Sequence, residues 1–228
     1  MKSIFIFSLI TLITGSPLLA LAIILIIYFF IDRRFIGLLP DFSAWWRRKR
    51  RIGDLKRTVG ANPHNGDALL ELGVSYYERK KFREAVDYFE RAYGRMKDWP
   101  EVHFFLGASS YETGNTDKGL AEIREALDMS PKISHGFPYI YLIRAILEGK
   151  SDSKSESIPE LENRLLRHGS VQAFYEAGKL LRRHGHKAEA QKFFREVLEN
   201  YSLSSPTFRR NYRKMAIMSR YYDMGIRN

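Results

Sequence analysis

The chain of 228 residues contains no cysteine, which excludes disulfides, thiolate metal sites and a cysteine nucleophile. It also lacks the phosphate-binding glycine loop, the dinucleotide fingerprint, the zinc-protease helix motif and the serine nucleophile elbow. The close histidine pair, His184 and His186, offers only two ligands and follows two arginines that repel cations. We therefore expect no catalytic residues, no cofactor and no metal, in a protein that is not an enzyme.

Acidic residues are in the minority, because 37 Lys and Arg face 26 Asp and Glu, for a net charge of +11. The excess is uneven: most of it lies in residues 32–57 and 206–228, and the stretch between them is close to neutral. Hydrophobic residues make up 45% of the chain, which is enough for a packed core. We therefore expect a folded middle region flanked by two basic segments.

The longest apolar run lies near the N-terminus, where residues 3–31 contain no charged side chain. About 20 apolar residues suffice for a spanning helix, so residues 1–34 are predicted to be a transmembrane anchor. Gly15, Ser16 and Pro17 would kink this helix or mark its outer end. The alternative is a signal peptide cleaved near residue 22, but the apolar run continues past that point and one lysine is a poor basic region.

Residues 35–62 are predicted to form an amphipathic, basic juxtamembrane helix that caps the folded region. Tryptophans beside a basic cluster fit a membrane interface with anionic headgroups. The predicted membrane-surface residues are Trp45, Trp46, Arg47, Arg48, Lys49, Arg50 and Arg51. The alternative for this cluster is a nuclear-import or nucleic-acid patch. Because basic loops stay in the cytoplasm, we expect a single-pass membrane protein with its folded region on the cytoplasmic side.

Small and apolar residues recur through the middle of the chain with a period of about 34 residues, which is typical of stacked helical hairpins. Small residues let two helices approach closely, and large apolar residues at three- and four-residue intervals give each helix one buried stripe. The recurring positions are Leu72 and Leu106; Gly73, Gly107 and Gly178; Ala85 and Ala190; Phe89 and Phe194; Ala92 and Ala126.

At these positions the chain resembles the tetratricopeptide repeat (TPR) family. The resemblance rests on the Leu-Gly-x-x-Tyr run of residues 72–76, on Ala85, Phe89 and Ala92, and on Pro131, whereas Gly119 stands where the family favours alanine. The expected fold is all-α, with the N-terminal transmembrane helix followed by a TPR-like α-solenoid of about four hairpins. The solenoid is placed at residues 63–204, with repeats at 66–99, 100–133, 134–170 (degenerate) and 171–204, and a basic C-terminal capping helix at 205–228.

In this family the first helix of each repeat lines a concave groove that holds a protein or peptide. The groove residues that the resemblance implies are Asp67, Leu70, Val74, Tyr77, Glu78, Glu101, Phe104, Tyr111, Glu112, Tyr175, Lys179 and Arg182. We expect a membrane-anchored adaptor or scaffold that binds a protein or peptide partner at the cytoplasmic face, in assembly or regulation of a membrane complex. The alternatives are an RNA-binding TPR protein that uses its basic terminal helix, and an extracytoplasmic envelope-assembly protein with reversed topology.

Overall fold

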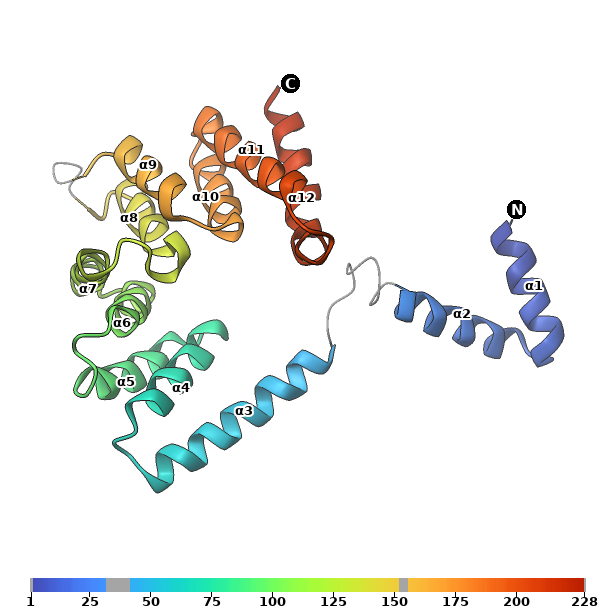
Figure 1. Cartoon of the computed structure of the whole chain (residues 1–228), viewed down its shortest axis with the longest axis horizontal. Coiled ribbons are helices and arrows are strands. Elements are labelled where there is room, and N and C mark those ends of the chain that lie inside the picture. Colours follow the sequence, from blue (N-terminus) through green and yellow to red (C-terminus); the bar gives the residue numbers. More distant parts are fainter. Residues whose placement is uncertain (1, 32–41, 152–155, 228) are drawn as a thin grey trace.

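The computed structural model describes residues 2–31, 42–151 and 156–227, and within them the chain forms twelve α-helices and one short 3-10 helix. The four hairpins are α4 (Gly66–Glu78) with α5 (Phe82–Tyr93), α6 (Pro100–Glu112) with α7 (Thr116–Met129), α8 (Phe137–Leu147) with α9 (Ile158–His168), and α10 (Val171–Arg183) with α11 (Lys187–Leu203). The 3-10 helix η2 (Ile133–Gly136) precedes α8, α3 (Phe42–Ala61) precedes the first hairpin and α12 (Pro206–Arg227) follows the last. Figure 1 shows these hairpins as one curved stack, which confirms the predicted all-α solenoid.

The N-terminal apolar run forms two helices, α1 (Lys2–Thr14) and α2 (Pro17–Ile31), where one spanning helix was predicted that would kink or end at Gly15–Pro17. Gly15 has a left-handed φ of +65°, which ends α1, and Pro17, which has no N–H to donate, begins α2. The two helices have 13 and 15 residues, fewer than the roughly 20 that a spanning helix needs. Among the residues that the structure describes, no helix is both long enough and apolar enough to cross a membrane. The predicted boundary between anchor and juxtamembrane helix, at residue 34, lies outside the described residues.

Glycines allow the two helices of the first and last hairpins to approach closely, at the positions that the repeat predicts. A Cβ atom on Gly73 would lie 2.6 Å from Phe89 Cδ1, and one on Gly178 would lie 2.7 Å from Phe194 Cε1. Packed carbon atoms do not come this close. In both hairpins the first helix therefore needs a residue without a side chain, because an aromatic ring of the second helix occupies that space.

The second hairpin makes its close contact through two backbones instead of a backbone and a ring. A Cβ atom on Gly107 would lie 2.7 Å from the carbonyl oxygen of Gly119, and one on Gly119 would lie 2.7 Å from the amide nitrogen of Tyr111. An alanine at position 119, which the family favours, would not fit between α6 and α7. The departure from the family pattern at this position thus has a packing cause.

The buried side chains form two clusters, one from α3 to the start of α6 and the other from α6 to α12. Tyr77 and Phe105 are half-buried and pack against both clusters, so they connect the two parts of the core. At the C-terminal end α12 packs on α11 and covers the last repeat, as the sequence predicts. The docked residues of α12 are Phe208, Tyr212, Met215, Ala216 and Tyr222.

Candidate functional site

Two neighbouring pockets lie on the side of the solenoid formed by the first helices of the hairpins. The N-terminal pocket is bounded by α3, α4 and α6, and the central pocket by α4, α6, α8 and α10. The second helices contribute no residue to either pocket. The Tyr77 and Phe105 rings meet edge to face with centroids 5.4 Å apart, and this ring pair separates the two pockets.

The N-terminal pocket has an apolar wall and a charged rim, in a volume of about 480 Å³. Its apolar residues are Ile52, Leu70, Val74 and Phe105; its charged residues are Arg48, Arg51, Glu71, Glu78, Arg79 and Glu101. An apolar surface with a few polar groups around it is what a binding pocket for an organic side chain requires. The pocket could therefore take a large apolar side chain whose neighbours meet the charged rim.

Helix α3 forms one side of this pocket and is held there mainly by burial. Arg51 on α3 pairs with Glu71 on α4 at 2.9 Å, but both side chains are largely exposed, and such a pair is worth about 0–1 kcal/mol. Ile52 and Val59 of α3 are buried against the first hairpin. Burial of a side chain of this size contributes roughly 1.5–3 kcal/mol, so these two residues fix the position of α3.

The central pocket encloses about 310 Å³ and combines aromatic, apolar and charged residues. Its lining residues are Tyr77, Glu112, Phe137, Ile140, Tyr141, Arg144, Gln172, Glu176, Lys179, Leu180 and Arg183. On its α10 side, Lys179 Nζ donates to Glu176 at 2.9 Å, while Gln172 and Arg183 are exposed. Hydrogen-bond donors thus predominate on the α10 wall.

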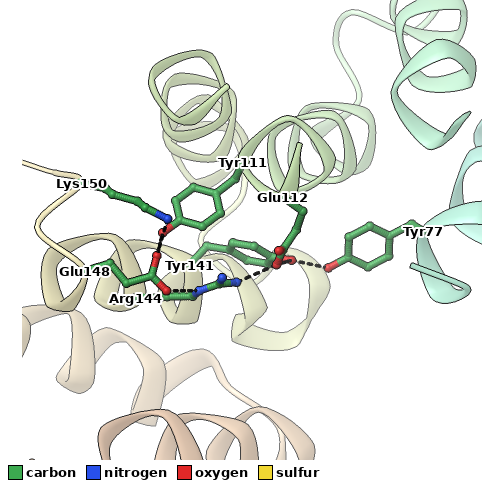
Figure 2. A network of polar contacts seen from close by, with 7 residues as sticks. All are labelled: Tyr77, Tyr111, Glu112, Tyr141, Arg144, Glu148 and Lys150. Atoms are coloured by element: carbon green, nitrogen blue, oxygen red, sulfur yellow. Dashed lines mark hydrogen bonds and ion pairs between the residues drawn. The ribbon is translucent and has the colours of Figure 1, made fainter. Parts of the chain in front are cut away.

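The pocket residues Tyr77, Tyr141 and Glu112 belong to a chain of hydrogen bonds, which Figure 2 shows. Tyr141 donates its hydroxyl proton to Glu112 Oε1 at 3.3 Å, so in the 2.8 Å contact between the two phenols Tyr77 is the donor. Burial raises the pKa of Tyr77 and Tyr141, which keeps both phenols protonated at neutral pH. The Tyr77 oxygen consequently keeps its lone pairs for a ligand that donates a hydrogen bond.

Arg144 on α8 joins two carboxylates and completes the network in Figure 2. It donates from Nη1 to Glu112 Oε1 and from Nε to Glu148 Oε1, each at 2.7 Å. Tyr111 and Lys150 donate to the other oxygen of Glu148, at 2.9 Å and 2.6 Å. Burial alone would raise the pKa of Glu148, but the hydrogen bonds from Lys150, Arg144 and Tyr111 outweigh it and lower the pKa to about 2. The network is therefore charged and fixed before any partner binds.

The structure brings seven of the predicted groove residues into the two pockets. Leu70, Val74, Glu78 and Glu101 line the N-terminal pocket, and Tyr77, Glu112 and Lys179 line the central pocket. The predicted residues that line the pockets come from α4, α6 and α10, three of the four first helices. These seven are the predicted groove residues that line a pocket.

The other five predicted groove residues line neither pocket, and four of them contact side chains from other parts of the solenoid. Phe104 is buried beside Tyr141 of α8, and its neighbour Phe105 faces the pocket instead. Tyr111 is buried with its hydroxyl bonded to Glu148. Arg182 lies over the Tyr222 ring of α12 at 4.2 Å, Tyr175 packs near Phe194, and Asp67 is exposed in the first turn of α4.

Sequence reasoning missed the contribution of α8, which belongs to the degenerate repeat. In the clear repeats the predicted groove residues fall at positions 2, 5, 9, 12 and 13 of the repeat. The same count from Phe137 selects Tyr141 and Glu148 but not Arg144. Arg144 lines the central pocket and donates to Glu112 of α6, beside Tyr141, which is hydrogen-bonded to residues of α4 and α6.

The predicted membrane-surface residues lie on the N-terminal half of α3. Arg48 and Arg51 line the N-terminal pocket, so two members of the basic cluster belong to the groove. Arg47, Lys49 and Arg50 are exposed, and Trp46 is exposed with Lys49 Nζ 6.0 Å from its ring centroid. The side chain of Trp45 lies outside the described part of the structure. In the described ranges no cluster of three or more His, Asp or Glu residues could hold a metal ion.

Family profiles and solved structures of known proteins match this architecture. Residues 52–100 and 172–204 each match a family profile described as tetratricopeptide repeat. Among solved structures, MamA is similar with a TM-score of 0.51 and 19% identity, over 72% of this chain and 97% of MamA. YrrB, described as a TPR protein with an unusual peptide-binding site, has a TM-score of 0.46 and 12% identity, over 75% of this chain and 91% of YrrB. A search of the curated proteins finds no significant match.

Proposed function

We propose that this chain, a tetratricopeptide-repeat protein, is a scaffold that binds a segment of a partner protein in the groove formed by the N-terminal and central pockets. The observation that carries the proposal is that two adjacent pockets, separated by one ring pair, lie along the first helices of the repeats. An extended segment can place alternate side chains in adjacent pockets. The prearranged hydrogen-bond network adds orientation without an ordering cost at binding.

We further propose that α1 and α2 attach the scaffold to a membrane, with the repeats on the cytoplasmic side. Helix α2 consists almost entirely of apolar residues and α1 is mostly apolar, and they expose Leu12, Leu18 and Phe30 by 83%, 77% and 65%. Apolar surfaces of this kind need a nonaqueous environment or a partner. The basic residues of α3, which follow in the chain, favour the cytoplasmic side. A binding role in assembly or regulation of a membrane complex, and not catalysis, is the function this arrangement supports.

Site-specific photocrosslinking of the full-length protein in its native membrane tests the groove. A photoreactive phenylalanine analogue at Tyr77 should give crosslinked partner, whereas the same analogue at Trp99, which is exposed and lines neither pocket, should not. Mass spectrometry of the adduct identifies the bound segment. Equal adduct from both positions, or from neither, would remove the support for a binding groove.

A pair of matched variants tests whether the pocket itself is used. Val74→Arg fills the N-terminal pocket and should abolish the Tyr77 adduct. Val86→Arg places the same side chain on α5, at a half-buried valine outside both pockets, and should leave the adduct in place. Circular dichroism of both variants establishes that the fold is retained.

A further inference from the structure

The C-terminal helix α12 has a second face that no other described helix covers. One face of α12 is docked on α11, and the opposite face exposes Ile217, Met218, Tyr221 and Met224 by 53%, 37%, 64% and 53%. The positions 210, 213, 214, 217, 221 and 224 recur at intervals of three and four residues, which places them on one side of a helix. We call this side the outer face of α12. Monomeric soluble proteins rarely expose a contiguous apolar stripe of this kind to water.

Cations adjoin the apolar residues on this outer face. Arg210 and Arg213 lie one to two turns before Ile217, Lys214 lies one turn before it, and Arg220 flanks it. The single carboxylate of α12, Asp223, is buried on the docked side, where it meets Arg195 of α11 at 3.4 Å. The outer face therefore carries positive charge and no negative charge.

Arg209 has a different role from these cations, although it belongs to the same basic cluster. Its Nε donates to the carbonyl oxygen of Ser204 and its Nη2 to that of Ser202, each at 2.8 Å. These carbonyls end α11, so Arg209 joins α12 to the preceding helix. Arg209 thus holds α12 in place, whereas Lys214 and Arg220 are exposed beside the apolar residues of the outer face.

The combination of positive charges and apolar groups on the outer face indicates which kind of partner could cover it. In a second copy of the chain, the same face would oppose cations with cations, since it has no carboxylate to pair with them. A nucleic acid would use the cations but leaves Ile217, Met218 and Met224 without an apolar partner. An anionic bilayer surface satisfies both, because headgroups meet the cations and the headgroup–acyl boundary takes the apolar residues and Tyr221. We propose that the outer face of α12 lies on an anionic lipid surface, as a membrane contact separate from α1 and α2.

Absence of cysteine makes a direct test simple, because one introduced cysteine is labelled uniquely. Full-length protein carrying Ile217→Cys with an environment-sensitive fluorophore is reconstituted in phosphatidylcholine vesicles with or without phosphatidylserine. With phosphatidylserine present, the emission should shift to the blue and spin-labelled lipids should quench it. A label at Glu125→Cys, an exposed position on α7, should show neither effect.

Charge variants then establish that cations hold α12 on the surface. Each Lys or Arg near an anionic surface strengthens binding about fivefold, so Lys214→Gln with Arg220→Gln should weaken docking about 25-fold. The matched control, Lys132→Gln with Lys187→Gln, removes the same charge at exposed positions on other parts of the chain and should leave docking unchanged.

Three outcomes would overturn the proposal. The label at position 217 could remain as open to an aqueous quencher with phosphatidylserine as without it. Lipid quenching could be equal in neutral and anionic vesicles, which would assign the effect to α1 and α2 alone. Single-stranded RNA could shield the label with a steep salt dependence while anionic vesicles do not, which would assign the face to nucleic acid. None of these results depends on the groove, whose occupancy is measured separately by the Tyr77 crosslink.

Discussion

Replacing Gly73 by alanine should destabilise the first hairpin, whereas the same replacement at Gly53 should stabilise the protein. Both glycines lie inside helices, in α4 and α3. They differ in their surroundings: no atom lies within 4 Å of a Cβ built on Gly53, while a Cβ on Gly73 overlaps the Phe89 ring. That ring has no exposed surface and stacks on Phe105 with centroids 5.7 Å apart, so it cannot move away.

The expected magnitude follows from two opposing contributions. Alanine is favoured over glycine in a helix interior by about 1 kcal/mol, and this is the whole effect at Gly53. Overpacking a filled core costs about 1–3 kcal/mol, which at Gly73 offsets or exceeds that gain. The two variants should therefore differ by about 1–3 kcal/mol in the free energy of unfolding, which corresponds to roughly 2–12 °C in Tm for a chain of this size.

Urea unfolding followed by circular dichroism measures the difference, and hydrogen exchange of the α4 and α5 amides locates it. Exchange should accelerate in these two helices first, because repeats open locally. Gly178→Ala, which meets Phe194 in the same way, should repeat the result in α10 and α11. If Gly73→Ala raised the urea midpoint as much as Gly53→Ala does, the close packing of α4 on α5 would be wrong.

Further predictions concern the network and the membrane. Glu148 has a folded-state pKa of about 2, whereas the ordinary value is 4.5. Its ionised form therefore stabilises the fold fully above pH 4.5, and this contribution to the free energy of unfolding is lost as the pH falls towards 2. Glu148→Gln should therefore flatten the pH dependence of the urea midpoint in that window, by up to about 3 kcal/mol, and an unchanged slope would contradict the network. Tyr77→Phe should cost about 1 kcal/mol of stability through the lost bond to Tyr141, with the double variant Tyr77→Phe/Tyr141→Phe as the test of coupling. The full-length chain should resist alkaline extraction from membranes, and release of a shortened form would indicate a cleaved signal peptide. Protease outside sealed cells should leave the repeats intact, and digestion without lysis would reverse the topology.

The sequence by itself determined the helices of the solenoid and the residues at which they touch. A period of about 34 residues with small residues at fixed positions specifies local helix formation and the closest contact within each hairpin, and both depend on neighbours near in sequence. Gly73 and Gly178 therefore meet rings where the pattern places them. The docked stripe of α12 follows for the same reason, since it is a simple helical periodicity against the last repeat.

Only the tertiary structure decided which residues face the groove and that the apolar run forms two separate helices. Phe104 and Phe105 are adjacent and equally apolar, and the way α8 packs on α6 buries the first and leaves the second in the pocket. Arg144 enters the network because the packing of α8 on α6 brings it next to Glu112, in addition to Glu148 at the end of its own helix. Such contacts depend on the superhelical arrangement of several repeats, which no local pattern specifies. The left-handed conformation of Gly15, which separates α1 from α2, is likewise one of the conformations a glycine permits and not one that its sequence position requires.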